Sequence, residues 1–259
     1  MQMFRQQLNL FFLALSFFSR LPVPATVDYS PQLLNQSGRY FSLVGLVLAL
    51  LLLAFYQSVL LFLPVSIALI LLIIASLLLT GAFHEDGLAD MADGIGGGIT
   101  INQRLAIMKD SRLGTYGTVS IVSALALKYV LLVELAQQQL LIASILVGYS
   151  LSRATAASLI FDMNYVSDNE TSKSKPLAMK QTVKELWLLL VIGALPLVLL
   201  PLNTVVIIVV MLAIFRFSFK YWLNKRLGGY TGDCLGAAQQ IAELLIYLSI
   251  VANIAGALS

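Results

Sequence analysis

Residues 64–98 read PVSIALILLIIASLLLTGAFHEDGLADMADGIGGG. The first part, residues 64–83, is apolar and carries no charge. A helix needs roughly 20 such residues to cross the hydrocarbon core of a bilayer. Four carboxylates follow directly, within nine residues: Glu85, Asp86, Asp90 and Asp93. The stretch therefore predicts a membrane span that leads into an acidic, glycine-rich segment.

The rest of the chain has the same apolar character. Hydrophobic residues make up 59% of the 259 residues and charged residues only 11%, against roughly 25% charged in soluble domains. The apolar runs are continuous rather than alternating, which favours helices over barrel strands because a helix satisfies its own backbone hydrogen bonds in lipid. We expect one all-α domain over residues 1–259, a polytopic transmembrane helical bundle with about seven spans: 41–62, 64–83, 114–136, 140–160, 186–201, 204–222 and 236–257.

The basic residues give the bundle a direction. They occupy four connections: Arg5, Arg20 and Arg39; Arg104, Lys109 and Arg112; Lys173, Lys175, Lys180 and Lys184; and Lys220, Lys225 and Arg226. With seven spans all four lie on one side, which the positive-inside rule makes the cytoplasm. This spacing is typical of loop anchors, so no nucleic-acid partner is expected. The short apolar run Leu8 to Phe18 is expected on the same side, as an interfacial or re-entrant helix.

The acidic segment has the spacing of a metal site. On a helix, Asp86, Asp90 and Asp93 share one face, because they lie four and three residues apart. Crowded carboxylates repel one another, and a divalent cation relieves that repulsion. Carboxylate oxygens suit Mg²⁺, with substrate phosphate completing the shell. We therefore predict that these three residues, with Glu85 as a further candidate, hold Mg²⁺, and that Asp93 or Asp90 acts as a base. The alternative is a solvated acidic loop.

Neighbouring residues suggest phosphate binding. The glycines after the carboxylates permit close backbone approach or positive φ, and their N–H groups can cradle an anion. The arginine and lysine side chains that follow can bind phosphate. Taken singly, each of them is explained equally well as a loop anchor. A second glycine-rich turn, 228–236, contains an aspartate that is either a ligand or a helix cap. The candidate substrate-binding residues are Gly96, Gly97, Arg104, Lys109, Asp110, Arg112 and Asp233.

Several ionisable residues fall elsewhere. Charges inside spans are expected to face the bundle interior and to pair, and Arg153 and Glu243 are placed near the cytoplasmic cavity. Lys128 and Glu134 are interpreted either as a buried pair or as snorkelling ends. His84, the only histidine, is either a hydrogen-bonded helix-end residue or a group that orients a ligand.

Several blocks in order resemble one family, the adenosylcobinamide-GDP ribazoletransferases or cobalamin synthases. The blocks are His84 to Gly94, Ile107 to Gly117, Gly38 to Gly45, Gly228 to Ala237 and Leu21 to Pro24. The resemblance implies a Mg²⁺-dependent enzyme of the bacterial inner membrane, with cytoplasmic active-site loops, acting late in cobalamin biosynthesis. It would join adenosylcobinamide-GDP to α-ribazole or α-ribazole 5′-phosphate and release GMP. Further copies of the chain or other proteins of that pathway are possible partners.

Two other classes of membrane protein are alternatives. A transporter would be expected to show inverted repeats and broken helices near the membrane midplane, whereas here the carboxylates concentrate in one segment. A CDP-alcohol phosphotransferase also sets aspartates at a membrane face, but its usual aspartate motif has a longer spacing. Neither alternative accounts for the ordered blocks as well as a ribazoletransferase does.

Overall fold

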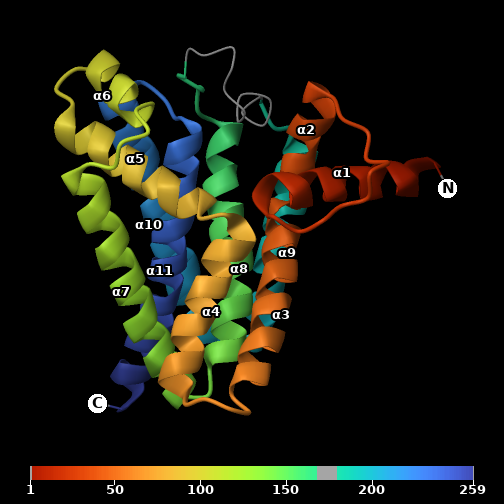
Figure 1. The fold of residues 1–259 in the computed structure, drawn as a ribbon, viewed down its shortest axis with the longest axis vertical. Helices are drawn as coiled ribbons and strands as arrows, with labels where there is room; N and C mark the ends of the chain where they lie inside the picture. The colour runs from red at the N-terminus through yellow and green to blue at the C-terminus, as the bar shows by residue number, and fades with distance from the viewer. Residues whose placement is uncertain (1, 168–179, 259) are drawn as a thin grey trace.

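A computed structural model describes residues 2–167 and 180–258 of the chain, and these residues form a bundle of helices (Figure 1). Within them the only extended pairing is an isolated bridge between Tyr165 and Tyr230, so the all-α prediction is confirmed. The α-helices are α1 (Gln2–Phe18), α2 (Pro31–Ser37), α3 (Phe41–Val59), α4 (Val65–Thr80), α5 (Phe83–Gly97), α6 (Ile101–Met108), α7 (Thr115–Gln137), α8 (Leu141–Ser158), α9 (Val183–Ala194), α10 (Leu202–Leu227) and α11 (Gly232–Leu258).

Five helical segments of the described residues are long and apolar enough to cross a membrane: Pro31–Val59, Thr115–Gln137, Leu141–Phe161, Leu202–Leu227 and Gly232–Ile254. Each overlaps a predicted span. Helices of this length and composition indicate a membrane protein. The predicted count of seven is not confirmed, because the other two candidate spans, 64–83 and 186–201, are bent or interrupted.

The predicted span 186–201 is interrupted by a proline. Helix α9 begins at a capping box, in which Thr182 and Glu185 satisfy each other's backbone N–H groups. It ends at Ala194, and a short 3-10 helix, Leu195–Leu199, contains Pro196. Proline has no N–H to donate and its ring clashes with the preceding turn, so it ends a regular α-helix. The resulting α9 of 12 residues is shorter than a bilayer crossing.

The span predicted at 64–83 ends in a corner. Helix α4 closes at Gly81 and the next residue, Ala82, is also left-handed, with φ of 67° and 56°. Helix α5 starts at once and is bent by 85° from α4. The acidic segment and the residues that follow it therefore form mainly two helices, α5 and α6. We treat α4 as the membrane arm and α5 as lying outside the spanning segments, at the mouth of the bundle (Figure 1).

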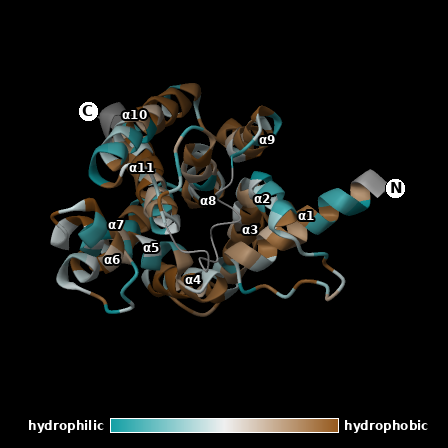
Figure 2. Ribbon diagram, turned by 90° about the horizontal axis from the view of Figure 1, so that it is seen from above, coloured by the Kyte–Doolittle hydropathy of each residue, from teal (hydrophilic) through white to brown (hydrophobic). Residues whose placement is uncertain are grey.

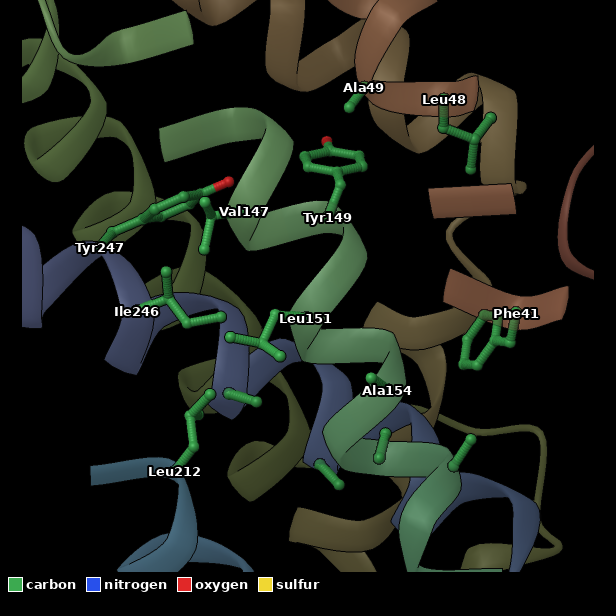
Figure 3. Packing of buried hydrophobic residues seen from close by; sticks show 14 of the residues in the cluster. Phe41, Leu48, Ala49, Val147, Tyr149, Leu151, Ala154, Leu212, Ile246 and Tyr247 are labelled. Atoms are coloured by element: carbon green, nitrogen blue, oxygen red, sulfur yellow. The ribbon is translucent and has the colours of Figure 1, made fainter. Parts of the chain in front are cut away.

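Helix α8 forms the centre of the bundle. It packs against α3, α9 and α11, and nearly all of its residues are buried. Figure 3 shows Tyr149, Leu151 and Ala154 of α8 among residues of α3, α10 and α11. Helices α7 and α10 instead leave most of their apolar surface exposed, and α10 is largely hydrophobic in Figure 2. Outer apolar surface of this kind suits contact with lipid.

The N-terminal apolar run is helical, as predicted, and forms part of α1. It lies across the end of the bundle that also carries α5 and α6 (Figure 1), and it packs against α2 and α3. We call this end, formed by α5, α6 and the start of α11, the polar end. The helix is longer than the predicted run, because it begins at Gln2 rather than Leu8.

Candidate active site at the polar end

The site is built on a close contact between α5 and α11. A Cβ added at Gly87 would lie 2.9 Å from the carbonyl oxygen of Asp233, and one added at Gly236 would lie 3.1 Å from that of His84. Only glycine leaves room for two backbones at this distance. The contact places the start of α11 beside the acidic face of α5, so that Asp233 joins the carboxylates of residues 86 and 90.

Asp90 is the electrostatic centre of this group. Its pKa is raised to about 7, first by burial and then by the negative charges of Asp86, Asp233 and Asp93. Asp86 is exposed, whereas Asp90 and Asp233 are half-buried. From its position in the sequence Asp233 is either a ligand or a helix cap, and in the structure its charge acts on Asp90. We call Asp86, Asp90 and Asp233 the carboxylate cluster.

Asp93 points away from the cluster. Its carboxylate accepts hydrogen bonds from the backbone N–H of Gly114 at 2.7 Å and of Gly117 at 2.8 Å. These groups begin α7, whose first N–H donors have no partner within the helix. The side chain is buried, and both of its oxygens are engaged. Asp93 therefore acts as a cap for α7 supplied by a distant part of the chain.

Glu85 also lies apart from the cluster. It is buried, and its Oε1 accepts a hydrogen bond of 2.9 Å from the amide of Gln240 on α11. Its Oε2 has no hydrogen-bond partner. Among the residues that the structure describes, no three histidine, cysteine or acidic side chains are arranged to hold a metal ion. Of the four predicted ligands, two therefore belong to the carboxylate cluster, Asp93 caps α7, and Glu85 lies in the bundle interior.

The bundle interior beneath Glu85 contains a polar network that sequence reasoning found only in part. The Gln240 amide donates to Gln239 at 2.8 Å, and the Gln239 amide donates to Glu243 at 2.8 Å. Glu243 pairs with Lys128 at 2.8 Å. The interpretation of Lys128 and Glu134 as a buried pair is wrong, because Glu134 is exposed. The two glutamines are consecutive in α11, and amides give no charge signal in a sequence.

The three basic residues predicted to bind phosphate differ in their surroundings. Arg104 is buried and donates to the backbone carbonyls of Gly98 and Arg226, at 3.0 and 2.8 Å, which ties α6 to the end of α10. Arg112 pairs with Asp110 on the surface. That partner lowers the pKa of Asp110 to about 2. Lys109 is exposed and lies in the same connection.

The glycines of α5 act through close packing. None of them has positive φ; among the described glycines only Gly81 and Gly228 do. A Cβ at Gly96 would lie 2.6 Å from the ring of Tyr116, and one at Gly97 would meet only the end of Ile107, at 3.4 Å. The close approach predicted for this segment is therefore present, and the positive φ is not.

These features define a class: an all-helical membrane protein with a carboxylate cluster at one end of its bundle. The family model described as cobalamin-5-phosphate synthase matches residues 10–251. The chain belongs to this family, and the resemblance noted in the sequence is confirmed. No solved structure matches the chain.

Three curated relatives carry the same name, adenosylcobinamide-GDP ribazoletransferase. The protein of Vibrio parahaemolyticus is 56% identical over 96% of this chain and 94% of its own length. That of Vibrio vulnificus is 54% identical, over 97% and 99%. That of Shewanella piezotolerans is 49% identical, over 97% and 98%. Family and relatives together make the chain a transferase of cobalamin synthesis.

Proposed function

We propose that the protein joins adenosylcobinamide-GDP to α-ribazole or α-ribazole 5′-phosphate, with release of GMP. A ribose hydroxyl oxygen of the ribazole attacks the phosphorus that carries cobinamide. A new P–O bond forms, the P–O bond to the GMP phosphate breaks, and the hydroxyl proton passes to a base. The observation that supports this reaction at the polar end is the carboxylate cluster of Asp86, Asp90 and Asp233, with the raised pKa of Asp90.

Asp90 suits the role of base. A general base works best when its pKa is near the working pH, and that of Asp90 is raised to about 7. Asp93, the other predicted base, holds two backbone N–H groups, so its oxygens are not free to take a proton without uncapping α7. We assign proton acceptance to Asp90 and positioning to Asp93.

The cluster also fits a magnesium ion. Protein sites for Mg²⁺ typically supply one or two carboxylates, and water and substrate phosphate fill the other positions. The support is the chemistry of the donors, because the charges of Asp86 and Asp233 both act on Asp90. Asp86 and Asp233 would hold the ion, which when bound would neutralise charge on the diphosphate. Lys109 and Arg112 lie in the connection to α7, and we propose that they contact the outer phosphates.

The polar end would face the cytoplasm of a bacterial inner membrane. The support is the positive-inside rule, because Lys225 and Arg226 lie in the last turn of α10 at the same end as Arg104 and Lys109 of the α6 region. Arg104 contacts the carbonyl of Arg226 directly, so these two basic connections share one side.

The reaction is tested by GMP release from purified full-length protein. The protein is supplied with adenosylcobinamide-GDP and α-ribazole 5′-phosphate, with Mg²⁺ or with a chelator. GMP should form only when both substrates and the ion are present. GMP formed without the ribazole would indicate hydrolysis, and undiminished turnover in chelator would remove magnesium from the proposal. Omitting either substrate is the matched control.

A further inference from the structure

A small aromatic cavity lies next to the carboxylate cluster, on the other side of the α5–α11 contact. It is lined by rings from three helices, Phe17 and Phe18 of α1, Phe41 of α3, and Phe83 and His84 of α5, and by Gly236 of α11. Phe18 stacks on Phe41 with 3.8 Å between ring centroids. Phe83 meets His84 edge to face at 5.5 Å. The lining is therefore mostly apolar and rich in rings, with His84 and Tyr165 as its polar side chains.

His84 lines this cavity, and one of its two ring nitrogens has no partner. His84 is 2% exposed, and its Nε2 has no hydrogen-bond partner. An unsatisfied buried polar group costs about 1–3 kcal/mol, so this nitrogen calls for a partner. Phe41 and Gly236, which lie against His84, offer no side-chain donor or acceptor, and Tyr165 carries the one hydroxyl of the lining. A ligand with a polar atom of its own can satisfy the imidazole.

The two proposed substrates each carry a flat ring system, and the chemistry of the lining favours one of them over the other. Guanine presents donors and acceptors around most of its edge, and an apolar wall would leave them unsatisfied. The base of α-ribazole is a dimethylated benzimidazole, which is flat and apolar and has one unsubstituted ring nitrogen. That nitrogen accepts a hydrogen bond and cannot donate one. His84, in the tautomer with its hydrogen on Nε2, supplies the matching donor.

Resting on the proposed function, we infer that this cavity is the subsite for the base of the ribazole acceptor. His84 donates from Nε2 to the free ring nitrogen, and the phenylalanines hold the two faces and the methylated edge. The nucleoside would then be anchored beside the chemistry, because Gly232 also lines the cavity and its neighbour Asp233 belongs to the carboxylate cluster. His84 is a specificity-determining residue in this account.

The cavity must widen to admit the base. Its volume is about 40 Å³, whereas a cavity that holds benzene measures about 150 Å³. The wall best able to move is Phe83, which is 39% exposed and stands directly after the left-handed residue Ala82. Rotation of this ring outward would enlarge the cavity at the cost of its edge contacts with Phe17 and Phe18.

The test compares two acceptors on the wild-type protein. One is α-ribazole and the other is its indole analogue, in which C–H replaces the free ring nitrogen. Binding of each is measured by calorimetry without adenosylcobinamide-GDP. We expect α-ribazole to bind about tenfold more tightly, the effect of one buried hydrogen bond. Equal affinity would overturn the inference, as would a cavity that takes up a lipid chain in place of either acceptor.

Variants then assign the preference to His84. His84→Phe should bind both acceptors equally and raise the KM for α-ribazole about tenfold, with the KM for adenosylcobinamide-GDP unchanged. Phe62→Leu, altering a side chain that is 83% exposed in the turn between α3 and α4, should keep the preference. A His84→Phe protein that still prefers α-ribazole contradicts the inference. The binding data need no turnover, so absence of GMP release would count against the proposed function alone.

Discussion

The Lys128 ammonium lies 2.8 Å from the Glu243 carboxylate, and the two side chains are only 4% and 2% exposed. The pair joins α7 to α11 inside the bundle. Gln239 and Tyr247, at 2.8 and 3.0 Å, donate to the same carboxylate. Glu243 is therefore the acceptor on which the interior donors converge, and the network continues through Gln240 to Glu85 at the start of α5. A packing defect at Glu243 would be transmitted to the helix that carries the carboxylate cluster.

Glu243→Gln should destabilise the protein by about 3–5 kcal/mol, because it leaves the Lys128 ammonium buried without its partner. The double variant Lys128→Met, Glu243→Gln should recover part of that loss, since the buried ammonium is removed together with its partner. Unfolding in detergent micelles measures both. Glu134→Gln, at an exposed position on the same α7, is the control and should stay within about 0.5 kcal/mol of wild type. Equal stability of Glu243→Gln and wild type would contradict the role given to the pair.

Asp90 and Asp93 should respond in opposite ways to substitution. Asp90→Asn should lower GMP release at least about a hundredfold and leave stability unchanged or higher, because it removes repulsion within the carboxylate cluster. Asp93→Ala should lower stability by about 1–3 kcal/mol, because two N–H groups at the start of α7 lose their acceptor. Rates and melting temperatures of both purified variants separate the roles. Loss of stability in Asp90→Asn without loss of rate would reverse the assignment.

The stability of the metal-free protein should fall as the pH rises from about 4 to about 7. The pKa of Asp90 is 3.8 for an ordinary carboxyl and about 7 in the fold, so in this window the folded protein holds a proton that the unfolded chain has lost. Stability falls with pH wherever the folded state binds more protons. Melting temperatures across this range should show the fall, and Asp90→Asn should reduce it. A variant with the same pH dependence as wild type would show that another group titrates.

Two glycine substitutions on α5 make a matched pair. Gly87→Ala should lower both stability and GMP release, because the new methyl group meets the backbone of Asp233 at 2.9 Å, and an overpacked contact costs about 1–3 kcal/mol. Gly97→Ala adds the same group where only the end of Ile107 lies nearby, at 3.4 Å, and should be tolerated. Similar behaviour of the two variants would argue against a tight α5–α11 contact as the basis of the site.

Most of the fold follows from the apolar runs, because each continuous run has one way to satisfy its backbone in lipid. The structure departs from the predicted spans at two places. Each departure has a local cause that the length of an apolar run does not indicate. Pro196 divides the predicted span 186–201, and the left-handed pair Gly81 and Ala82 turns the acidic segment into a helix across the mouth.

The sequence predicts which segment carries the candidate site, but it does not predict how the side chains are arranged there. Spacing on α5 identified Asp86 and Asp90, whereas the partner Asp233 comes from α11 and is brought in by packing at Gly87. Asp93 satisfies the same spacing rule and yet caps a distant helix. Helical periodicity states which side chains share a face and says nothing of what that face meets.

Helix α8 is the least apolar of the five span-length segments and the most enclosed. It also carries Arg153 in its buried length, and a charge there makes insertion of an isolated segment unfavourable by a few kcal/mol. The helix that encloses it on one side, α11, leaves the ribosome after it. During biogenesis the centre of the protein must therefore be retained at the insertion machinery, sheltered by earlier segments, until the last helix arrives.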